Sequence, residues 1–328
     1  KYTVSFQREI WNKMIFSFDW FLNLGNRLPV TIDINAWNPH YTYNTPRSVW
    51  NVSVTNPFRN YLTPQTFPGS LRNSSTVAIT QLLRPYPQYQ AINMINSDLR
   101  KSKVQSYKFQ LQQPYYKGMT FTVAYAYNDE WTTEAFDDIA LYDRDFSWRR
   151  TDAAKHRFTN TISWEIPFGR GRQFFTNAPK VLDYIIGGWR LTNLTRYYSG
   201  RLLQFTGSMI VNGDPKISGT DQTQNRWFDT SVFSAVPDPG YLVRRTNPYY
   251  FDGLTGPYTF QTDATMSKSF AIRESMKLEF RLEMYNVTNH VNWDNPILTF
   301  GNANFGKVIA KRSAYTGREV QYGLRFVF

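Results

Sequence analysis

The 328-residue chain contains no cysteine. This absence excludes disulfide bridges, thiolate nucleophiles and cysteine-bound zinc sites, and it says little about the cellular compartment. Histidine is scarce, because the chain has only His40, His156 and His290, far apart in the sequence. These residues lack the His-x-x-x-His spacing and the glutamate partners of a metal site. We therefore expect no metal ion and no cofactor.

Long hydrophobic runs are also missing. The longest candidate, VLDYIIGGW at 181–189, contains an aspartate and two glycines. No stretch approaches the ~20 apolar residues of a membrane-spanning helix, so a helical membrane protein is excluded. The first residues, KYTVSFQREI, lack the apolar core and the small-residue cleavage site of a signal peptide. They have the pattern of a β-strand instead.

Aromatic residues are abundant. They make up 17% of the chain, although its mean hydropathy is only −0.49. This combination is typical of a transmembrane β-barrel, in which only alternate residues face lipid. The net charge is +12, but Lys and Arg are scattered, which favours a solvated surface and a polar interior. Attraction of anionic lipid headgroups or substrates is the functional alternative, and we expect no nucleic-acid partner.

Alternation of apolar and polar residues is the dominant pattern. It is clearest at 119–128, where Met119, Phe121 and Val123 alternate with small and polar residues. Such lengths suit a tilted membrane strand of ~9–11 residues better than the shorter strands of a sandwich. The sequence therefore predicts an all-β fold, a transmembrane antiparallel β-barrel. Nine strands are expected, at 2–10, 14–22, 104–115, 119–128, 155–168, 186–199, 258–271, 277–286 and 317–328.

The connections between these strands alternate in length. Tight turns are predicted at 11–13, 116–118 and 273–275, and long loops at 25–103, 129–154, 200–257 and 291–317. Outer-membrane barrels have short periplasmic turns and long extracellular loops. One connection, 169–185, is long for the periplasmic side. Nine strands cannot form a whole bacterial barrel, which has an even number, so we expect residues 1–328 to be the C-terminal part of one larger barrel domain.

Four charged residues share one face of a predicted strand: Lys277, Glu279, Arg281 and Glu283. In lipid, each Lys or Arg near the bilayer midplane would cost ~2–4 kcal/mol, and Glu less. These side chains are therefore expected to face the lumen. There they could contact a plug or neighbouring lumen charges.

Two other patterns have weaker functional readings. Asp137, Asp138, Asp143 and Asp145 gather in one predicted loop, but their spacing is not that of an EF-hand, so a solvated loop is favoured over calcium binding. The glycine-rich FGRGR at 168–172 lacks the Lys-Ser/Thr and the strand–loop–helix context of a phosphate loop, so it predicts a turn. No arrangement of an activated nucleophile is visible, and we expect no enzymatic activity.

The order of several motifs resembles a known family, the TonB-dependent outer-membrane receptors, in the C-terminal part of their barrel. The similarity is to the Oar-like branch in particular, which is abundant in Acidobacteria and carries an N-terminal carboxypeptidase-regulatory-like domain. Each motif is weak alone, but their order and spacing are specific. The matching segments are YTVSFQREI, LRPYPQY, DAAKHRFTNTISWEIPFGRGR, GGWRLTNLTRYYSGRLLQF, WFDTSVF, GPYTFQTDATMSKSF, FRLEMYNVTNHVNW, FGKV and the terminal strand.

The resemblance implies a barrel of about 22 strands with a plugged lumen, and energised uptake through the TonB system. The plug, the TonB box, the regulatory-like domain and the first part of the barrel are absent from this sequence. Expected partners are outer-membrane lipid, lipopolysaccharide and the barrel-assembly machinery. That machinery reads a terminal aromatic strand, whose pattern is matched by Tyr322, Leu324, Phe326 and Phe328.

Three functions are consistent with the sequence. The first is an importer in the bacterial outer membrane, for a siderophore, sugar, peptide or protein. The second is a structural barrel that binds partner proteins through long aromatic loops such as 37–61. The third and weakest is a soluble β-rich carbohydrate-binding protein.

Overall fold

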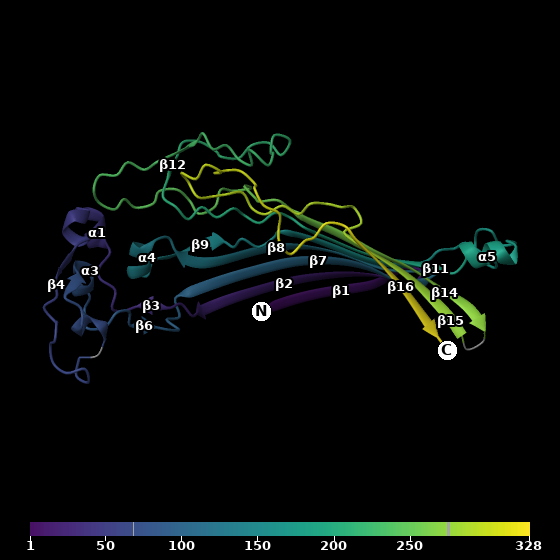
Figure 1. Ribbon diagram of the computed structural model, residues 1–328, viewed down its shortest axis with the longest axis horizontal. Coiled ribbons are helices and arrows are strands. Elements are labelled where there is room, and N and C mark those ends of the chain that lie inside the picture. The colour runs from purple at the N-terminus through teal and green to yellow at the C-terminus, as the bar shows by residue number, and fades with distance from the viewer. Residues whose placement is uncertain (68, 274–275) are drawn as a thin grey trace.

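A ten-stranded antiparallel sheet dominates the computed structural model, which describes residues 1–67, 69–273 and 276–328 (Figure 1). Nine strands follow one another across it in chain order. The tenth, β9 (Phe146–Arg150), pairs with the end of β8. The other strands are β1 (Tyr2–Trp11), β2 (Met14–Leu28), β7 (Arg100–Tyr116), β8 (Met119–Ala135), β10 (His156–Glu165), β11 (Trp189–Tyr198), β14 (Thr259–Arg273), β15 (Met276–Tyr285) and β16 (Glu319–Val327).

The nine predicted strands are all present, and each lies beside its neighbours in the sequence. This up-and-down order confirms the expected all-β, antiparallel fold. In the described part of the chain the sheet is open, because β1 pairs only with β2, and β16 pairs only with β15.

Several strand bounds differ from the prediction. β2, β7 and β8 extend well beyond the apolar alternation, because their hydrogen-bonded register continues, for example, to the pair Leu28 and Arg100. The strand predicted at 186–199 begins only at Trp189, since Lys180–Ile186 forms the helix α5. Of the predicted turn at 273–275, residues 274 and 275 lie outside the described residues.

The sheet has one apolar and one polar face, as alternating side chains require. A row of aromatic residues runs in register across seven strands and defines what we call the apolar face. Two of its rings, Phe18 and Phe109, have centroids 5.1 Å apart. The row consists of Phe6, Phe18, Phe109, Tyr125, Phe158, Tyr197 and Phe260.

The long connections carry the buried hydrophobic clusters. One cluster is built from Leu203, Phe205, Met209, Phe228, Phe233 and Leu254, and a smaller one from Phe67, Leu71 and Val77. Among the described residues, none of the buried hydrophobic side chains belongs to a strand of the ten-stranded sheet. The apolar face is therefore not the dry centre of a two-layer sandwich. Val4 and Phe6 on β1, for example, are 55% and 51% exposed.

The connections lie at two ends of the sheet (Figure 1). The short-turn end has the β1–β2 and β7–β8 turns and the helix α5, and the long-loop end carries the other small elements. No helix in the described ranges is long and apolar enough to cross a bilayer. The small elements are β3 (Ile32–Asp33), α1 (His40–Asn44), α2 (Arg47–Trp50), β4 (Ser53–Thr55), η1 (Ser70–Arg72), β5 (Thr76–Ala78), α3 (Ile79–Leu82), β6 (Asn93–Met94), α4 (Asp138–Tyr142), β12 (Ile210–Val211) and β13 (Phe233–Ser234).

Candidate functional site

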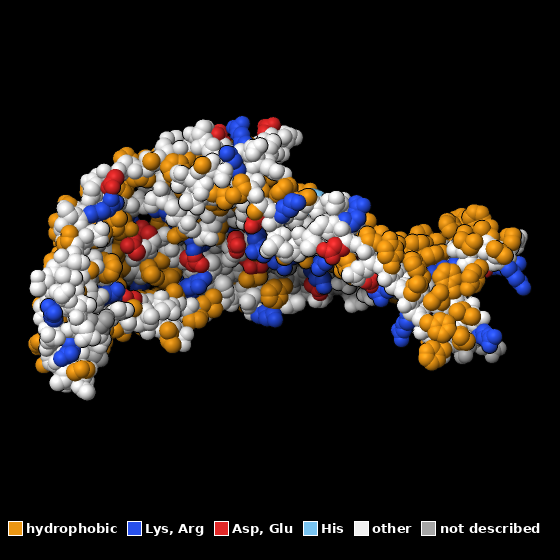
Figure 2. All heavy atoms as spheres, in the orientation of Figure 1, with side chains coloured by type: hydrophobic (Ala, Val, Ile, Leu, Met, Phe, Trp, Pro, Cys, Tyr) orange, Lys and Arg blue, Asp and Glu red, His pale blue; other side chains and the backbone are white. Residues whose placement is uncertain are grey.

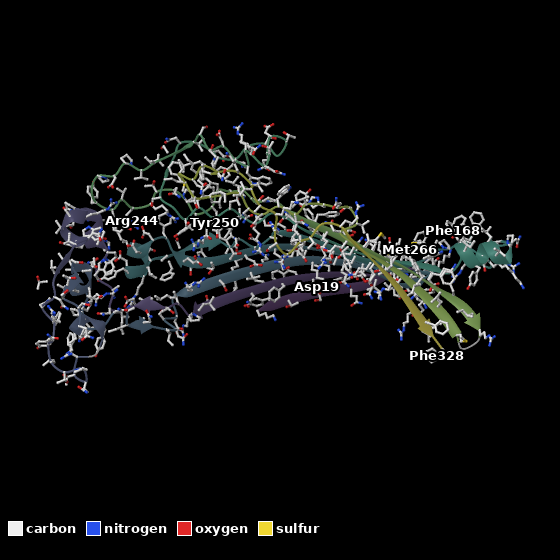
Figure 3. The ribbon with its side chains drawn as sticks, in the orientation of Figure 1. Asp19, Phe168, Arg244, Tyr250, Met266 and Phe328 are labelled. Atoms are coloured by element: carbon white, nitrogen blue, oxygen red, sulfur yellow. The ribbon has the colours of Figure 1, made fainter. Side chains whose placement is uncertain are left out.

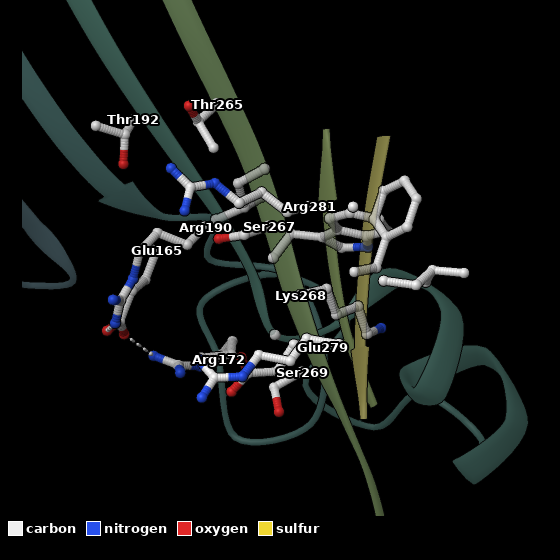
Figure 4. Close-up of a pocket in the computed structure, with 17 residues that line it drawn as sticks. Glu165, Arg172, Arg190, Thr192, Thr265, Ser267, Lys268, Ser269, Glu279 and Arg281 are labelled. Atoms are coloured by element: carbon white, nitrogen blue, oxygen red, sulfur yellow. Dashed lines mark hydrogen bonds and ion pairs between the residues drawn. The ribbon is translucent and has the colours of Figure 1, made fainter. Parts of the chain in front are cut away.

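The polar face is hollowed near the short-turn end. The hollow has a volume of about 770 Å³ and is lined by strands β10, β11, β14, β15 and β16 (Figure 4). One row of cross-strand neighbours runs through it, and its register follows from the alternation of each strand. The row is Glu165, Arg190, Ser267, Arg281 and Gly323.

Glu165 is the centre of the charge network in this hollow. Its carboxylate accepts hydrogen bonds from Arg172 at 3.3 Å and from Arg190 at 3.1 Å. Both guanidinium groups remain well exposed, as does that of Arg281. Arg325 also lines the hollow. The surface therefore offers several accessible guanidinium groups, which suit acidic side chains or other anionic groups.

The predicted charged ladder lies along this hollow. Lys277 pairs with Glu279 at 2.8 Å, and Arg281 pairs with Glu283 at 2.6 Å. All four residues share one face of β15, and the register places Glu279 and Arg281 beside Ser269 and Ser267 of β14. The structure thus brings the four residues together. Their contact with a plug stays a prediction.

The residues of the terminal pattern lie on the other face of β16 and just beyond its end. Tyr322, Leu324, Phe326 and Phe328 are 76%, 71%, 48% and 91% exposed. The rings of Phe326 and Phe328 stack with centroids 6.1 Å apart, and Phe328 lies at the short-turn end (Figure 3). Recognition of these residues by the barrel-assembly machinery stays a prediction.

The acidic residues of the loop before β9 connect separate loops. His40 Nε2 lies 2.8 Å from a carboxylate oxygen of Asp143, and Tyr43 donates a hydrogen bond to Asp138 at 2.6 Å. Burial raises the pKa of Tyr43, and the hydrogen bond to the Asp138 carboxylate raises it further. These carboxylates therefore bind side chains of the 25–103 loop.

Asp137 joins this loop to a third one. It caps α4 by accepting a hydrogen bond from the Ala140 amide at 2.9 Å, and it accepts two from Arg244, at 2.8 and 3.0 Å. Burial opposes ionisation of the carboxyl group, but the bonds from Arg244 and Ala140 outweigh it, so the pKa of Asp137 is lowered. Figure 3 shows Arg244 among the long loops.

The other two histidines contact aromatic residues. His156 Nδ1 lies 2.7 Å from the Tyr125 hydroxyl. The His290 ring stacks on the Tyr258 ring, with the two centroids 5.3 Å apart. Among the described residues, no three His, Cys, Asp or Glu side chains gather as a metal ion would require. The FGRGR segment forms a turn, with positive φ angles at Gly169 and Gly171.

An arginine–aromatic stack in the long loops was not predicted from the sequence. Arg245 is 9% exposed. Its guanidinium carbon lies 3.2 Å from the centroid of the Tyr249 ring and 4.4 Å from that of Phe136. It also donates a hydrogen bond to the Phe205 carbonyl at 3.0 Å. Next to Tyr249, a hollow of about 480 Å³ is lined by aromatic and charged residues of β8, β9 and 248–252. Only the pair of arginines before NPYY could have drawn attention to this segment.

Comparisons with known proteins agree with this geometry. A family model described as an outer membrane beta barrel domain matches residues 1–321. The match spans nearly the whole chain and leaves out Tyr322–Phe328, and a search of curated proteins found no match. An antiparallel sheet whose apolar side chains stay unburied is the structure that such a domain requires. The chain therefore belongs to the outer-membrane β-barrel domain family, whose place is the bacterial outer membrane.

Proposed function

We propose that the chain is part of a TonB-dependent receptor of the Oar-like branch, which takes up a large or scarce solute through a plugged barrel. The observation that carries this proposal is the charged hollow on the polar face. Its accessible guanidinium groups and ion pairs surround about 770 Å³ of open space. Such a surface suits a folded plug that offers acidic and polar partners. The order of family-like motifs gives further support.

Barrel closure forms part of the proposal. The open edges of β1 and β16 would leave backbone N–H and C=O groups unpaired in a bilayer, at a cost of several kcal/mol for each group. We propose that further strands close the barrel to about 22 in total. The plug and the segment that contacts TonB would also lie outside these 328 residues.

The partners follow from this arrangement. Lipid and lipopolysaccharide would cover the apolar face, and the barrel-assembly machinery would read the terminal strand. The TonB system would act through the plug-bearing part of the protein. The proposed function is not enzymatic, and solute selection would lie in the long loops and the plug.

Photocross-linking tests the plug. A photoreactive phenylalanine analogue replaces Ser267 on the polar face in the full-length protein, and the matched control replaces its neighbour Met266 on the apolar face. The expected result is an intrachain cross-link from 267 to a segment preceding Lys1, and a lipid or lipopolysaccharide adduct from 266. Cross-links from 267 to lipid would contradict the proposal.

Energisation tests transport. In cells that carry the TonB system, the yield of the cross-link at 267 should change when a solute extract is added. This change should disappear after treatment with a protonophore or after deletion of TonB. If the solute leaves the yield of the cross-link unchanged, with or without the protonophore and with or without TonB, the barrel is static and the proposed transport is contradicted.

A surface scaffold is the second candidate. The observation that favours it is the exposed aromatic surface of the first long loop, where Tyr41 and Tyr61 are 41% and 50% exposed. In that case a photoreactive group at Tyr61 should cross-link to a separate surface protein. The group at Ser267 should then give no intrachain product.

A further inference from the structure

The connection between β10 and β11 differs from the other short-turn connections. We call residues 166–188 the α5 segment, because they contain the helix α5. The β1–β2 and β7–β8 turns, by contrast, consist of two residues each, 12–13 and 117–118. The α5 segment extends beyond the strands at the short-turn end (Figure 1). A two-residue turn would be sufficient to join two neighbouring strands, so we expect the additional residues to have a function.

The α5 segment is folded upon itself. The Phe174 amide donates to the Pro167 carbonyl and the Gly169 amide to the Phe174 carbonyl, both at 3.0 Å. Asp183 accepts a hydrogen bond from the Arg170 amide at 2.6 Å. Gly169 has a φ of +114°, and a side chain there would collide with the Asp183 carboxylate. The segment is thus an ordered unit whose polar groups bind one another.

A lysine on the apolar face holds this unit. Lys268 belongs to the apolar alternation of β14, and its cross-strand neighbours are Trp189 and Phe280. It is only 6% exposed. Figure 4 shows its side chain on the opposite side of the strands from Glu165 and Arg172. A lysine among lipid-facing residues is costly unless its ammonium group finds partners.

The partners of Lys268 are the carbonyl groups at the end of α5. Its Nζ donates to the carbonyl oxygens of Tyr184 and Ile185, the latter at 3.1 Å, and Trp189 Nε1 also donates to Ile185, at 2.9 Å. The last carbonyls of a helix lack partners within the helix and attract cations. The rings of Tyr184 and Phe270 pack with centroids 5.3 Å apart. Helix α5 is therefore held against the apolar face, while Arg172, earlier in the same segment, reaches Glu165 in the polar hollow.

The outer surface of the α5 segment is apolar and exposed. Its most exposed hydrophobic residues are Val181 at 76%, Phe175 at 60% and Ile185 at 60%. Phe168, Phe174, Leu182 and Tyr184 extend this surface. Figure 2 shows the hydrophobic side chains gathered at this end of the molecule, with basic residues at the edge. A contiguous apolar patch of this kind marks an interaction surface.

We propose that the α5 segment is an interfacial anchor that lies in the periplasmic leaflet of the outer membrane and binds phospholipid. Its patch continues the apolar face, which is the lipid-facing surface of an outer-membrane barrel. Amphipathic helices with aromatic and aliphatic residues on one side and basic residues beside them bind at such interfaces. Lys180 directly precedes Val181 and can approach lipid phosphates. The inference depends on the membrane barrel and not on the proposed transport.

Depth-dependent fluorescence quenching tests the anchor. Because the chain has no cysteine, Val181→Cys and Ile185→Cys can each carry an NBD label in a cysteine-free full-length protein. The protein is reconstituted in phosphatidylethanolamine–phosphatidylglycerol vesicles that contain phosphatidylcholine with a doxyl group at carbon 5 or carbon 12. Leu282→Cys on the apolar face is the lipid-exposed control, and Asp221→Cys in a long loop is the water-exposed control.

The anchor predicts that labels at 181 and 185 are quenched by the carbon-5 doxyl group more than by the carbon-12 group, and several-fold less by iodide than the label at 221. Quenching by iodide alone would overturn the proposal. Shielding from both iodide and doxyl lipids would also overturn it, because protein would then cover the patch.

Lys268→Met tests how the segment is held. The substitution keeps a long side chain and removes the ammonium group, so iodide quenching of the label at 185 should rise several-fold. The label at 282 should remain unchanged, which shows that the barrel is still folded. Unchanged quenching at 185 would contradict the role of Lys268.

Discussion

Val123 and Ala124 are adjacent residues in β8 that face opposite sides of the sheet. Val123 lies beside Leu111 and Asn160, and Ala124 lies beside Gln110 and Thr159. A membrane strand takes ~9–11 residues, so a span that begins at Met119 places both residues near the bilayer midplane.

We therefore predict that Val123→Arg lowers the free energy of unfolding by ~2–4 kcal/mol, because the guanidinium group would enter acyl chains. Ala124→Arg should cost much less, since its side chain reaches the wet lumen. Equilibrium urea unfolding in vesicles measures both values. Equal costs at the two positions would contradict the assignment of the faces.

Asp137 provides a pH-dependent contact between loops. Its pKa is lowered in the folded protein, against the opposing effect of burial, by the hydrogen bonds from Arg244 and Ala140. A lowered pKa stabilises the folded loops above the unfolded-state value of 3.8, and this stabilisation is lost as the pH falls through the folded-state value.

We expect the amide protons of α4 to be protected from exchange at pH 7 and to lose protection below about pH 4. Asp137→Asn should reduce protection already at pH 7, by about 1 kcal/mol, because Arg244 is half exposed. Hydrogen exchange, corrected for the intrinsic rate at each pH, measures this change. The reverse dependence, with protection that rises toward low pH, would contradict the account.

The partners of some single residues cannot be predicted from the sequence. The alternation around Met119–Tyr127 was sufficient to predict which side chains share a face. It could not explain Lys268, whose partners Tyr184 and Ile185 lie more than eighty residues earlier in the chain. Arg245 was missed for a similar reason, because Phe136, one of the two rings that it lies over, comes from another loop. Tertiary contacts determine both positions.

Among the elements, β16 allows folding to be separated from assembly. Phe326 is half exposed and Phe328 almost fully exposed, and their rings stack on each other. The double substitution Phe326→Ser and Phe328→Ser should therefore leave refolding in detergent nearly unchanged. In cells, the same variant should reduce the folded, heat-modifiable form several-fold, because the assembly machinery would lose its signal.

Arg325→Ser, on the polar face of the same strand, is the matched control and should behave like the unmodified protein. Gel mobility with and without boiling measures the folded fraction. An equal loss in cells and in detergent would show that the aromatic residues act through stability and not through recognition.

The sequence predicted the strands better than the helix. Nine strands were expected and found, because each one carries the apolar period that lipid requires. β8 continues past Asp129 and Glu130 to Ala135. This last part of the strand has no apolar alternation and is held by its pairing with β9. The seven-residue helix α5 was missed because so short a helix is not stable alone. It forms where Lys268 and Trp189 bind its last carbonyl groups.

At the scale of the whole molecule, the distribution of buried residues separates two kinds of packing. The long loops fold around their own small cores, as soluble domains do. The sheet, within the described residues, contributes no buried hydrophobic side chain, so its apolar face requires lipid. The sequence could predict this division from the alternation, but not the contacts among loops that are distant in the chain.

Spin labelling along β15 tests the two-faced sheet most directly. In the reconstituted full-length protein, a nitroxide is placed in turn at each position from 278 to 283, and its collisions with oxygen and with a water-soluble nickel complex are measured. We predict that 278, 280 and 282 favour oxygen, as lipid-exposed positions do, while 279, 281 and 283 favour the nickel complex. Labels at 278, 280 and 282 that are shielded from both reagents would place the apolar face inside a protein core and contradict the account.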